Sequence, residues 1–311
     1  MKPLISLIIP CYNEEESLPH LYKELVSISS KMDDRFGVQF EYVFVDDGSR
    51  DNTLEQLKEL AVQDDRVRYL SFSRNFGKEA AIYAGLQNCR GDYVSPIDAD
   101  LQHPPSMLID MYNGIVEEGY DRVAARRTSR DGEPYIRSMF ARGFYKLINR
   151  ISQTKMVDGA TDYSMMTRQM VDAILRLEEY NRFTKGLNSW VGFRTKWLPY
   201  QNVERAAGTT KWSFWSLFLY SLDGILSFST APLAIASISG ILLCLLAVII
   251  ICVVIIKTLL YGDPVAGFPT LICAVCVIGG IQLFCLGIMG QYISKMYLEV
   301  KRRPVYLVRE S

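Results

Sequence analysis

The chain has 311 residues and a formal net charge of zero, because 34 lysines and arginines balance 34 aspartates and glutamates. This length allows a main domain with a sizeable core plus an appendage, and the zero net charge excludes an overall electrostatic attraction to nucleic acid. The charges are unevenly distributed, because residues 231–256 and 264–294 contain none.

The first hundred residues alternate between two periodic patterns. Buried strands are expected at residues 4–10, 41–45, 67–72 and 93–97, and helices at 15–30, 52–62 and 78–87. In the second helix Leu54, Leu57 and Leu60 recur at helical spacing. Strands that alternate with helices predict an α/β fold, a mostly parallel sheet with helices on both faces.

Beyond residue 110 the pattern is weaker. Residues 122–150 are rich in arginine and are expected to form a loop that leads into a helix, and 161–180 are expected to contain another helix. The aromatic segment 212–228, with Asp223 as its only charge, suits a helix lying in a membrane interface. An ordinary core helix is the alternative for that segment.

Each uncharged stretch is longer than the ~20 apolar residues that cross a bilayer. Buried core helices share this composition, but two such runs in tandem favour a membrane hairpin. The loop between them carries one base, Lys257, whereas the tail carries Lys295, Lys301, Arg302, Arg303 and Arg309. Lysines and arginines are enriched on the cytoplasmic side of membrane proteins, so this distribution predicts a multi-pass plasma-membrane protein with both termini in the cytoplasm.

The expected organisation is a catalytic domain at 1–210, an interfacial helix at 211–230, transmembrane helices at 231–257 and 264–294, and a cytoplasmic tail at 295–311. No signal peptide is expected, because the apolar run at 6–9 is too short for one. Glycines in the second span allow close helix packing within a protomer or between the protomers of a homo-oligomer; they are Gly279, Gly280, Gly287 and Gly290.

Polar clusters follow three of the expected strands, at residues 10–14, 46–49 and 98–103. One acidic turn would usually be a helix cap or a solvated loop. In open parallel sheets, however, ligands bind beyond the carboxyl ends of the strands, so three clusters would converge on one edge. The chain has no G-x-G-x-x-G and no P-loop motif, which argues against a dehydrogenase and a P-loop ATPase.

Asp98 and Asp100 are separated by one residue, so in extended backbone their side chains lie on the same side. Two nearby carboxylates repel each other unless a cation intervenes. Mg²⁺ or Mn²⁺ is the expected cofactor, because such ions take one or two carboxylates together with water and substrate phosphate. Gln102 could add an oxygen or orient a water, and His103 is expected to be a structural neighbour.

Together with Arg-Asn-Phe-Gly-Lys at 74–78, these clusters resemble inverting family 2 glycosyltransferases with the GT-A fold. Within that family the chain resembles the dolichol-phosphate-mannose-synthase-like branch, and most closely the bactoprenol glucosyltransferases with two C-terminal spans. The resemblance covers essentially the whole chain. It implies transfer of one sugar, glucose from a uridine diphosphate donor, to a membrane polyprenyl phosphate, with N-acetylglucosamine and mannose donors as alternatives. The absent Q-x-x-R-W motif favours a single transfer.

The resemblance also implies roles for residues. The residues expected to bind the nucleotide are Pro10, Tyr12, Glu14, Asp46, Asp47, Arg74, Lys78 and Asp98. Metal binding falls to Asp98, Asp100 and Gln102. An aspartate beside the sugar is expected at Asp162, with Asp158 in reserve; the alternative for Asp162 is a helix cap.

The acceptor phosphate is already a nucleophile near pH 7, so it needs orientation more than a general base. Arginines can bring two like-charged phosphates together. The candidates are Arg126, Arg127, Arg130 and Arg137. Residues 205–212 resemble a segment of the family, and this resemblance adds Arg205 and Lys211 as phosphate contacts at the membrane surface. A solvated or headgroup-facing basic loop is the alternative for the first four, and snorkelling beside the first span for the last two.

Two other functions fit less well. A nucleotidyltransferase would carry a glycine-rich basic N-terminal loop, which this chain lacks, and would need no spans. A non-enzymatic membrane scaffold or small transporter would use ionisable groups within its spans, but both uncharged stretches lack Asp, Glu, Lys and Arg. The membrane glycosyltransferase is therefore the preferred hypothesis.

Overall fold

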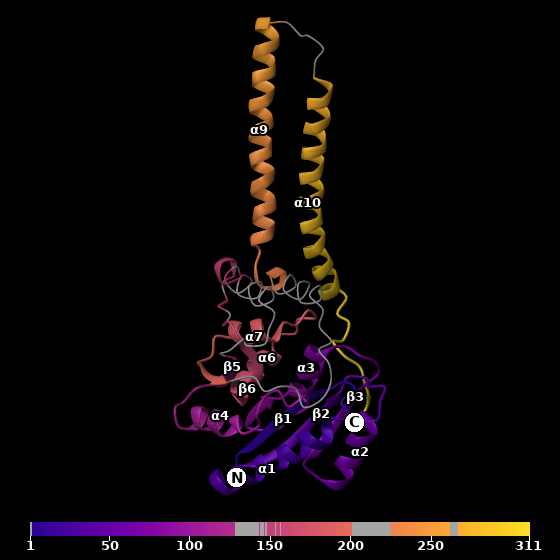
Figure 1. Cartoon of the computed structure of the whole chain (residues 1–311), viewed down its shortest axis with the longest axis vertical. Helices are drawn as coiled ribbons and strands as arrows, with labels where there is room; N and C mark the ends of the chain where they lie inside the picture. Colours follow the sequence, from indigo (N-terminus) through magenta and orange to yellow (C-terminus); the bar gives the residue numbers. More distant parts are fainter. Residues whose placement is uncertain are drawn as a thin grey trace.

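The computed structural model describes residues 2–127, 143, 146, 148–152, 154–155, 157–200, 225–261 and 267–311. An α/β body forms one end of the molecule, and two long helices run away from it side by side (Figure 1). The candidate site depends on how the sheet of this body is assembled.

The described strands form one eight-stranded sheet in the order β7-β5-β6-β4-β1-β2-β3-β8. Its centre is parallel and consists of β1 (Leu4–Cys11), β2 (Gln39–Asp46), β3 (Val67–Phe72) and β4 (Tyr93–Pro96). The flanks are β5 (Arg122–Arg127), β6 (Ala160–Thr167), β7 (Thr195–Tyr200) and β8 (Val308–Glu310). The strand β6 runs antiparallel to β4 and β5, and β8 runs antiparallel to β3.

Helices cover both faces of the sheet, as expected for a parallel centre. On β1, Ile5, Leu7 and Ile9 face one core, whereas Ile8 faces the other. The first core is closed by α1 (Leu18–Phe36), α2 (Thr53–Gln63) and α4 (Met107–Val116). The second is closed by α3 (Lys78–Asn88) and α6 (Arg168–Leu175). The prediction of an α/β fold with a two-faced sheet is confirmed.

One expectation was wrong, and another is confirmed but was incomplete. Residues 122–127 form β5 instead of a loop, because Val123, Ala124 and Ala125 are fully buried between strands although arginines surround them. The segment 161–180 does contain a helix, α6, but its first residues continue β6. The arginines of β5 made this strand look like a loop in the sequence. For β6, pairing with β4 and β5 outweighs the local preference for a helix.

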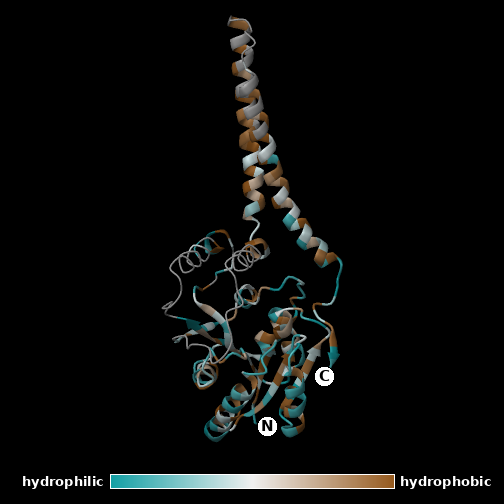
Figure 2. Cartoon of the chain, turned by 45° about the vertical axis from the view of Figure 1, so that its right-hand side comes forward, coloured by the Kyte–Doolittle hydropathy of each residue, from teal (hydrophilic) through white to brown (hydrophobic). Residues whose placement is uncertain are grey.

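The two long helices are α9 (Ala231–Tyr261) and α10 (Phe268–Val300). Their apolar side chains are largely exposed, and hydrophobic residues dominate both helices (Figure 2). In the described chain, only Val277–Val300 is long and apolar enough to cross a membrane by length and composition, and Ala231–Leu243 is a shorter apolar stretch. Most of the expected interfacial helix lies outside the described residues, which include a helical turn at 225–228.

The tail beyond α10 returns to the sheet instead of running free. Its strand β8 pairs with β3, and Ser73 N donates to Leu307 O at 3.0 Å. The ring of Tyr306 stacks on Phe72 with centroids 4.9 Å apart, and its hydroxyl group is 2.7 Å from Gln87 Oε1. This docking ties the end of α10 to the body.

Candidate active site

The loops after β1 and β2 are joined by hydrogen bonds. Asn13 N donates to Ser49 Oγ at 3.0 Å, and Arg50 N donates back to Asn13 Oδ1 at 2.9 Å. Glu14 N donates to Thr53 Oγ1 at 2.8 Å. The two loops therefore form one wall at the carboxyl edge, on which the half-buried Pro10, Tyr12 and Glu14 lie.

Asp46 and Asp47 hold these loops from within. Asp46 accepts hydrogen bonds from Ser49 N at 2.9 Å and Ser71 Oγ at 2.8 Å. Asp47 accepts from Phe76 N at 2.6 Å and Gly77 N at 2.9 Å. Burial raises the pKa of Asp47 to about 6, although these two backbone hydrogen bonds oppose the shift. Both carboxylates thus order the loops, and contact of either with a nucleobase stays a prediction.

Gly48 lies in the loop after β2 and contacts Arg74 in the loop after β3. Gly48 has φ +69°, and a β-carbon there would lie 2.6 Å from the carbonyl carbon of Arg74. The guanidinium carbon of Arg74 lies 4.0 Å from the centroid of the Phe76 ring, in cation–π geometry. Arg74 is exposed, so its side chain has room to contact a bound nucleotide.

Asp98 and Asp100 follow β4 and flank the buried Ala99, which is 4% exposed, while both aspartates are partly exposed. Ala99 and Asp100 lie in a turn and not in extended backbone, so the expectation that the two carboxylates share one side stays a prediction. Asp100 Oδ1 accepts a hydrogen bond from Gln102 N at 3.2 Å, which fixes the turn.

Side chains from other strands face the same space. Burial raises the pKa of Tyr200 to about 12; the charges of Asp98 and Asp100 act in the same direction. The charge of Arg127 acts in the opposite direction, so all three charged groups lie near this phenol at the end of β7. His103 is buried, with Nδ1 3.8 Å from Asp98 Oδ2, and burial lowers its pKa.

The donor set fits a divalent cation that is shared with a substrate. Among the described residues there is no group of three or more His, Cys, Asp or Glu side chains that could hold a metal ion by themselves. The two carboxylates and Gln102 leave several coordination positions for phosphate and water, as Mg²⁺ usually requires. Asp98, Asp100 and Gln102 would hold such an ion, which would neutralise charge on a diphosphate.

Lys78 lies among the acids. Its Nζ is 2.6 Å from Asp98 Oδ1 and 3.4 Å from Asp162 Oδ2. Burial acts to lower the pKa of Lys78, but the two carboxylates outweigh it, so the pKa is raised. The sequence placed Lys78 along the nucleotide; the structure pairs it with the two aspartates.

Asp162 is the third residue of β6, so the alternative that it caps a helix is wrong. Thr167 caps α6 instead, accepting a hydrogen bond from Met170 N at 3.4 Å. Burial acts to raise the pKa of Asp162, but Lys78 and Lys185 outweigh it, and the pKa is lowered. Asp162 is therefore an ionised carboxylate near neutral pH.

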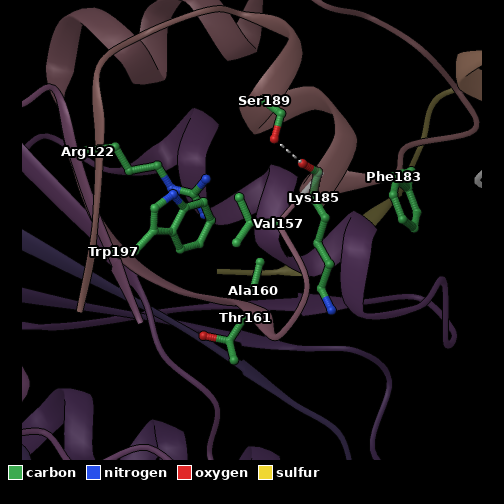
Figure 3. A pocket seen from close by; sticks show the side chains of 8 residues that line it. All are labelled: Arg122, Val157, Ala160, Thr161, Phe183, Lys185, Ser189 and Trp197. Atoms are coloured by element: carbon green, nitrogen blue, oxygen red, sulfur yellow. Dashed lines mark hydrogen bonds between the residues drawn. The ribbon is translucent and has the colours of Figure 1, made fainter. Parts of the chain in front are cut away.

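A small pocket includes Ala160 and Thr161, the two residues that precede Asp162 in β6 (Figure 3). Its lining comes from β5, β6, β7, α7 (Thr184–Trp190) and nearby residues: Arg122, Val157, Ala160, Thr161, Phe183, Lys185, Ser189 and Trp197. Burial lowers the pKa of Arg122 to about 10 against the opposing charge of Asp162. Its guanidinium carbon is 5.6 Å from the centroid of the Trp197 ring. Neither Arg122 nor Lys185 was expected from the sequence, since β5 and α7 bring them to Asp162 from distant parts of the chain.

The remaining candidates separate into two groups. Arg126 Nε donates to Asp158 O at 3.0 Å, so the turn before β6 is tied to the end of β5. The described ion pairs place Asp162, and not Asp158, beside Lys78. Four acceptor candidates lie outside the described residues: Arg130, Arg137, Arg205 and Lys211.

Comparisons with known proteins bear on this site. The model of "Glycosyl transferase family 2" matches residues 6–175. The putative glycosyltransferase CsbB of Bacillus subtilis (strain 168) is 46% identical over 308 residues, which is 99% of this chain and 92% of that protein. A bactoprenol glucosyl transferase of Shigella phage SfII is 40% identical over 310 residues, 99% and 98% of the two chains. Mannosyl-3-phosphoglycerate synthase from Rubrobacter xylanophilus is 17% identical over 72% of each chain, with a TM-score of 0.49.

Proposed function

This chain belongs to glycosyl transferase family 2, and from that premise we propose that it transfers one glucose from a nucleoside diphosphate sugar to a membrane polyprenyl phosphate. Relatives that are called bactoprenol glucosyl transferases match nearly the whole chain, including α9 and α10. The observation that supports the proposal is that Lys78 pairs with both Asp98 and Asp162, which brings the acidic turn after β4 close to the aspartate of β6.

The donor diphosphate is proposed to lie over Asp98, Asp100 and Gln102. A Mg²⁺ or Mn²⁺ ion bound there would offset the negative charge that develops on the leaving group. The wall that includes Tyr12 and Glu14 then borders the nucleoside, and Arg74 lies within reach of its outer side. In this arrangement the substrate phosphates supply ligands that the described part of the site does not provide by itself.

Asp162 is proposed to act as an ionised carboxylate beside the sugar. Its pKa lies below the usual value, so it accepts hydrogen bonds from sugar hydroxyls and cannot serve as the proton donor near pH 7. No strong general base is required, because the acceptor phosphate is largely dianionic near pH 7. In-line attack with inversion then depends on orientation. Among the described arginines, Arg127 is the proposed contact for that phosphate, since its charge and those of Asp98 and Asp100 all act on Tyr200.

The long helices are proposed to cross the membrane as a hairpin, with the catalytic body and both termini in the cytoplasm. The exposed apolar side chains of α9 and α10 support this placement, because they find no cover within the described chain. A lipid-bound acceptor stays at the bilayer surface. An enzyme that is fixed to the same surface keeps its active site within reach of that acceptor.

The test uses the purified full chain in detergent with undecaprenyl phosphate, Mg²⁺ and one sugar nucleotide at a time. UDP-glucose is expected to add the mass of one hexose to the lipid, as measured by mass spectrometry. UDP-N-acetylglucosamine and GDP-mannose are the matched alternatives, and a product with either would change the sugar but keep the reaction. If none of the donors gives a lipid product, the proposal is wrong.

A further inference from the structure

One ammonium group connects two carboxylates that have different expected tasks. Lys78 is the first residue of α3, Asp98 follows β4, and Asp162 belongs to β6. The ammonium of Lys78 is 2.6 Å from the first carboxylate and 3.4 Å from the second. Asp98 belongs to the expected metal pair, so a lysine occupies part of the space next to that pair.

This position is not a packing requirement. The ammonium of Lys78 is shielded from water by its surroundings, but the side chain as a whole is 44% exposed, so its end can shift between the two carboxylates without opening the core. Asp162 offers a second acceptor, and the Oδ1 atom of Asp162 has no hydrogen-bond partner among the described residues. Lys78 can therefore leave Asp98 and remain paired with a carboxylate.

A divalent ion on Asp98 and an ammonium on the same carboxylate repel each other at short range. The diphosphate of a sugar nucleotide changes this balance, because its negative charge attracts both cations. The two positive groups can then be close together only while the donor is present. Metal binding and donor binding should therefore strengthen each other.

We propose that Lys78 neutralises Asp98 before the donor binds and yields this carboxylate to the divalent ion when the diphosphate arrives, so that metal and donor enter together. This inference rests on the proposed function, because it takes the metal pair and the diphosphate from it. It makes Lys78 a positioning residue that couples two binding events. The consequence is that metal alone binds poorly, and a site occupied by metal without donor is rare.

The test measures binding of Mn²⁺ to the full chain in detergent, from the loss of the free-ion signal in electron paramagnetic resonance, with and without UDP. For the wild type, UDP is expected to strengthen Mn²⁺ binding by at least tenfold. Lys78→Met keeps the apolar stem but removes the charge, and should strengthen binding of Mn²⁺ alone about tenfold. The strengthening by UDP should fall by a similar factor, whereas Lys78→Arg should retain it.

Lys185→Met is the matched control, because Lys185 contributes positive charge near Asp162, whereas the ion pairs of Asp98 among the described residues are with Lys78 and His103. It should change binding of Mn²⁺ alone by less than twofold. An equal effect of Lys185→Met and Lys78→Met would mean a general charge effect and would overturn the inference. So would unchanged Mn²⁺ binding in Lys78→Met.

The two proposals fail in different ways. If the wild type glucosylates the lipid and UDP strengthens its Mn²⁺ binding, but Lys78→Met behaves like the wild type, only the role of Lys78 is overturned. If the wild type neither binds Mn²⁺ in the presence of UDP nor forms a lipid product, the proposed function fails and the inference falls with it. Circular dichroism and size-exclusion chromatography confirm that each variant is folded.

Discussion

Gly48 lies against the backbone of Arg74 so closely that a β-carbon on the glycine would be 2.6 Å from the arginine carbonyl carbon. No real β-carbon tolerates that separation from backbone, and the φ of +69° at Gly48 also disfavours a side chain. The contact holds together the loops after β2 and β3, both of which are expected to border the nucleotide.

Gly48→Ala should therefore weaken UDP binding by at least tenfold and lower the stability by about 2 kcal/mol or more. Gly37→Ala is the control, because Gly37 has φ +65° but nothing within 4 Å of a β-carbon. It should cost about 1 kcal/mol and leave UDP binding unchanged. Isothermal titration calorimetry and thermal unfolding give the two readouts. Equal behaviour of both variants would contradict a role for the contact.

Asp100→Asn should reduce sugar transfer at least a hundredfold while the melting temperature stays within a few degrees of the wild type. The amide retains the shape of the side chain but removes one of the two charges that attract a divalent ion. Asp110→Asn makes the same change at an exposed position on α4 and should have no effect. Full activity of Asp100→Asn in metal-depleted buffer would refute the metal assignment.

Asp162→Asn should lower the turnover number at least a hundredfold but change the affinity for UDP less than threefold. Its carboxylate is proposed to face the sugar and not the nucleoside, and Lys78 still has Asp98 as a partner after the change. Asp158→Asn is the matched comparison, since the described contacts of Asp158 O run to Arg126. A larger loss in Asp158→Asn would exchange the two roles.

Asp47 should make the protein more stable in mild acid than near neutrality. Its pKa of about 6 in the folded state exceeds the usual value of about 3.9. At Asp47 the folded state therefore binds a proton more tightly than the unfolded state does. The resulting stabilisation is fully present below the unfolded pKa of about 3.9 and is lost as the pH rises through about 6. Between pH 4.5 and 7.5 the contribution should fall by about 2 kcal/mol.

The measurement compares the unfolding free energy of the wild type with that of Asp47→Ala at both pH values. The variant loses its hydrogen bonds to Phe76 and Gly77 at every pH, so only the change with pH reports the titration. If the difference in unfolding free energy between the wild type and Asp47→Ala is the same at the two pH values, the pKa of Asp47 is not raised.

Tyr306→Ala should detach the tail and destabilise the α/β body by about 3 kcal/mol, since a stacked aromatic side chain and a hydrogen bond are lost together. Tyr306→Phe keeps the stacking on Phe72 and loses only the bond to Gln87, at a cost of about 1 kcal/mol. Limited proteolysis should cleave the tail faster in the first variant only. Equal cleavage of both variants would argue that the ring does not anchor the tail.

The centre of the fold was predictable because its information is local. Strands β1 to β4 and their helices follow from apolar periodicity, and the acidic clusters lie directly after the strands. The flanks were not predictable in this way. Strand β5 carries arginines at both ends, and β8 has only three residues, so each is defined by its partner strands and not by its own pattern.

The same distinction applies to the site. Asp98, Asp100 and Asp162 were recognised from motifs, but their electrostatic environment was not. Arg122 and Lys185 come from distant elements, and no sequence spacing relates them to Asp162. Burial of Arg122 contradicts the usual exposure of arginine, and only an assembled sheet reveals it.

The docking of β8 on β3 also sets an order of folding during synthesis. The ribosome makes β8 after α9 and α10, so the outer flank of β3 has no partner while the long helices emerge. An open strand flank can recruit another nascent chain through its backbone groups. Until residues 308–310 have been made, this flank of β3 therefore stays open to such contacts, and the pairing of β8 closes it.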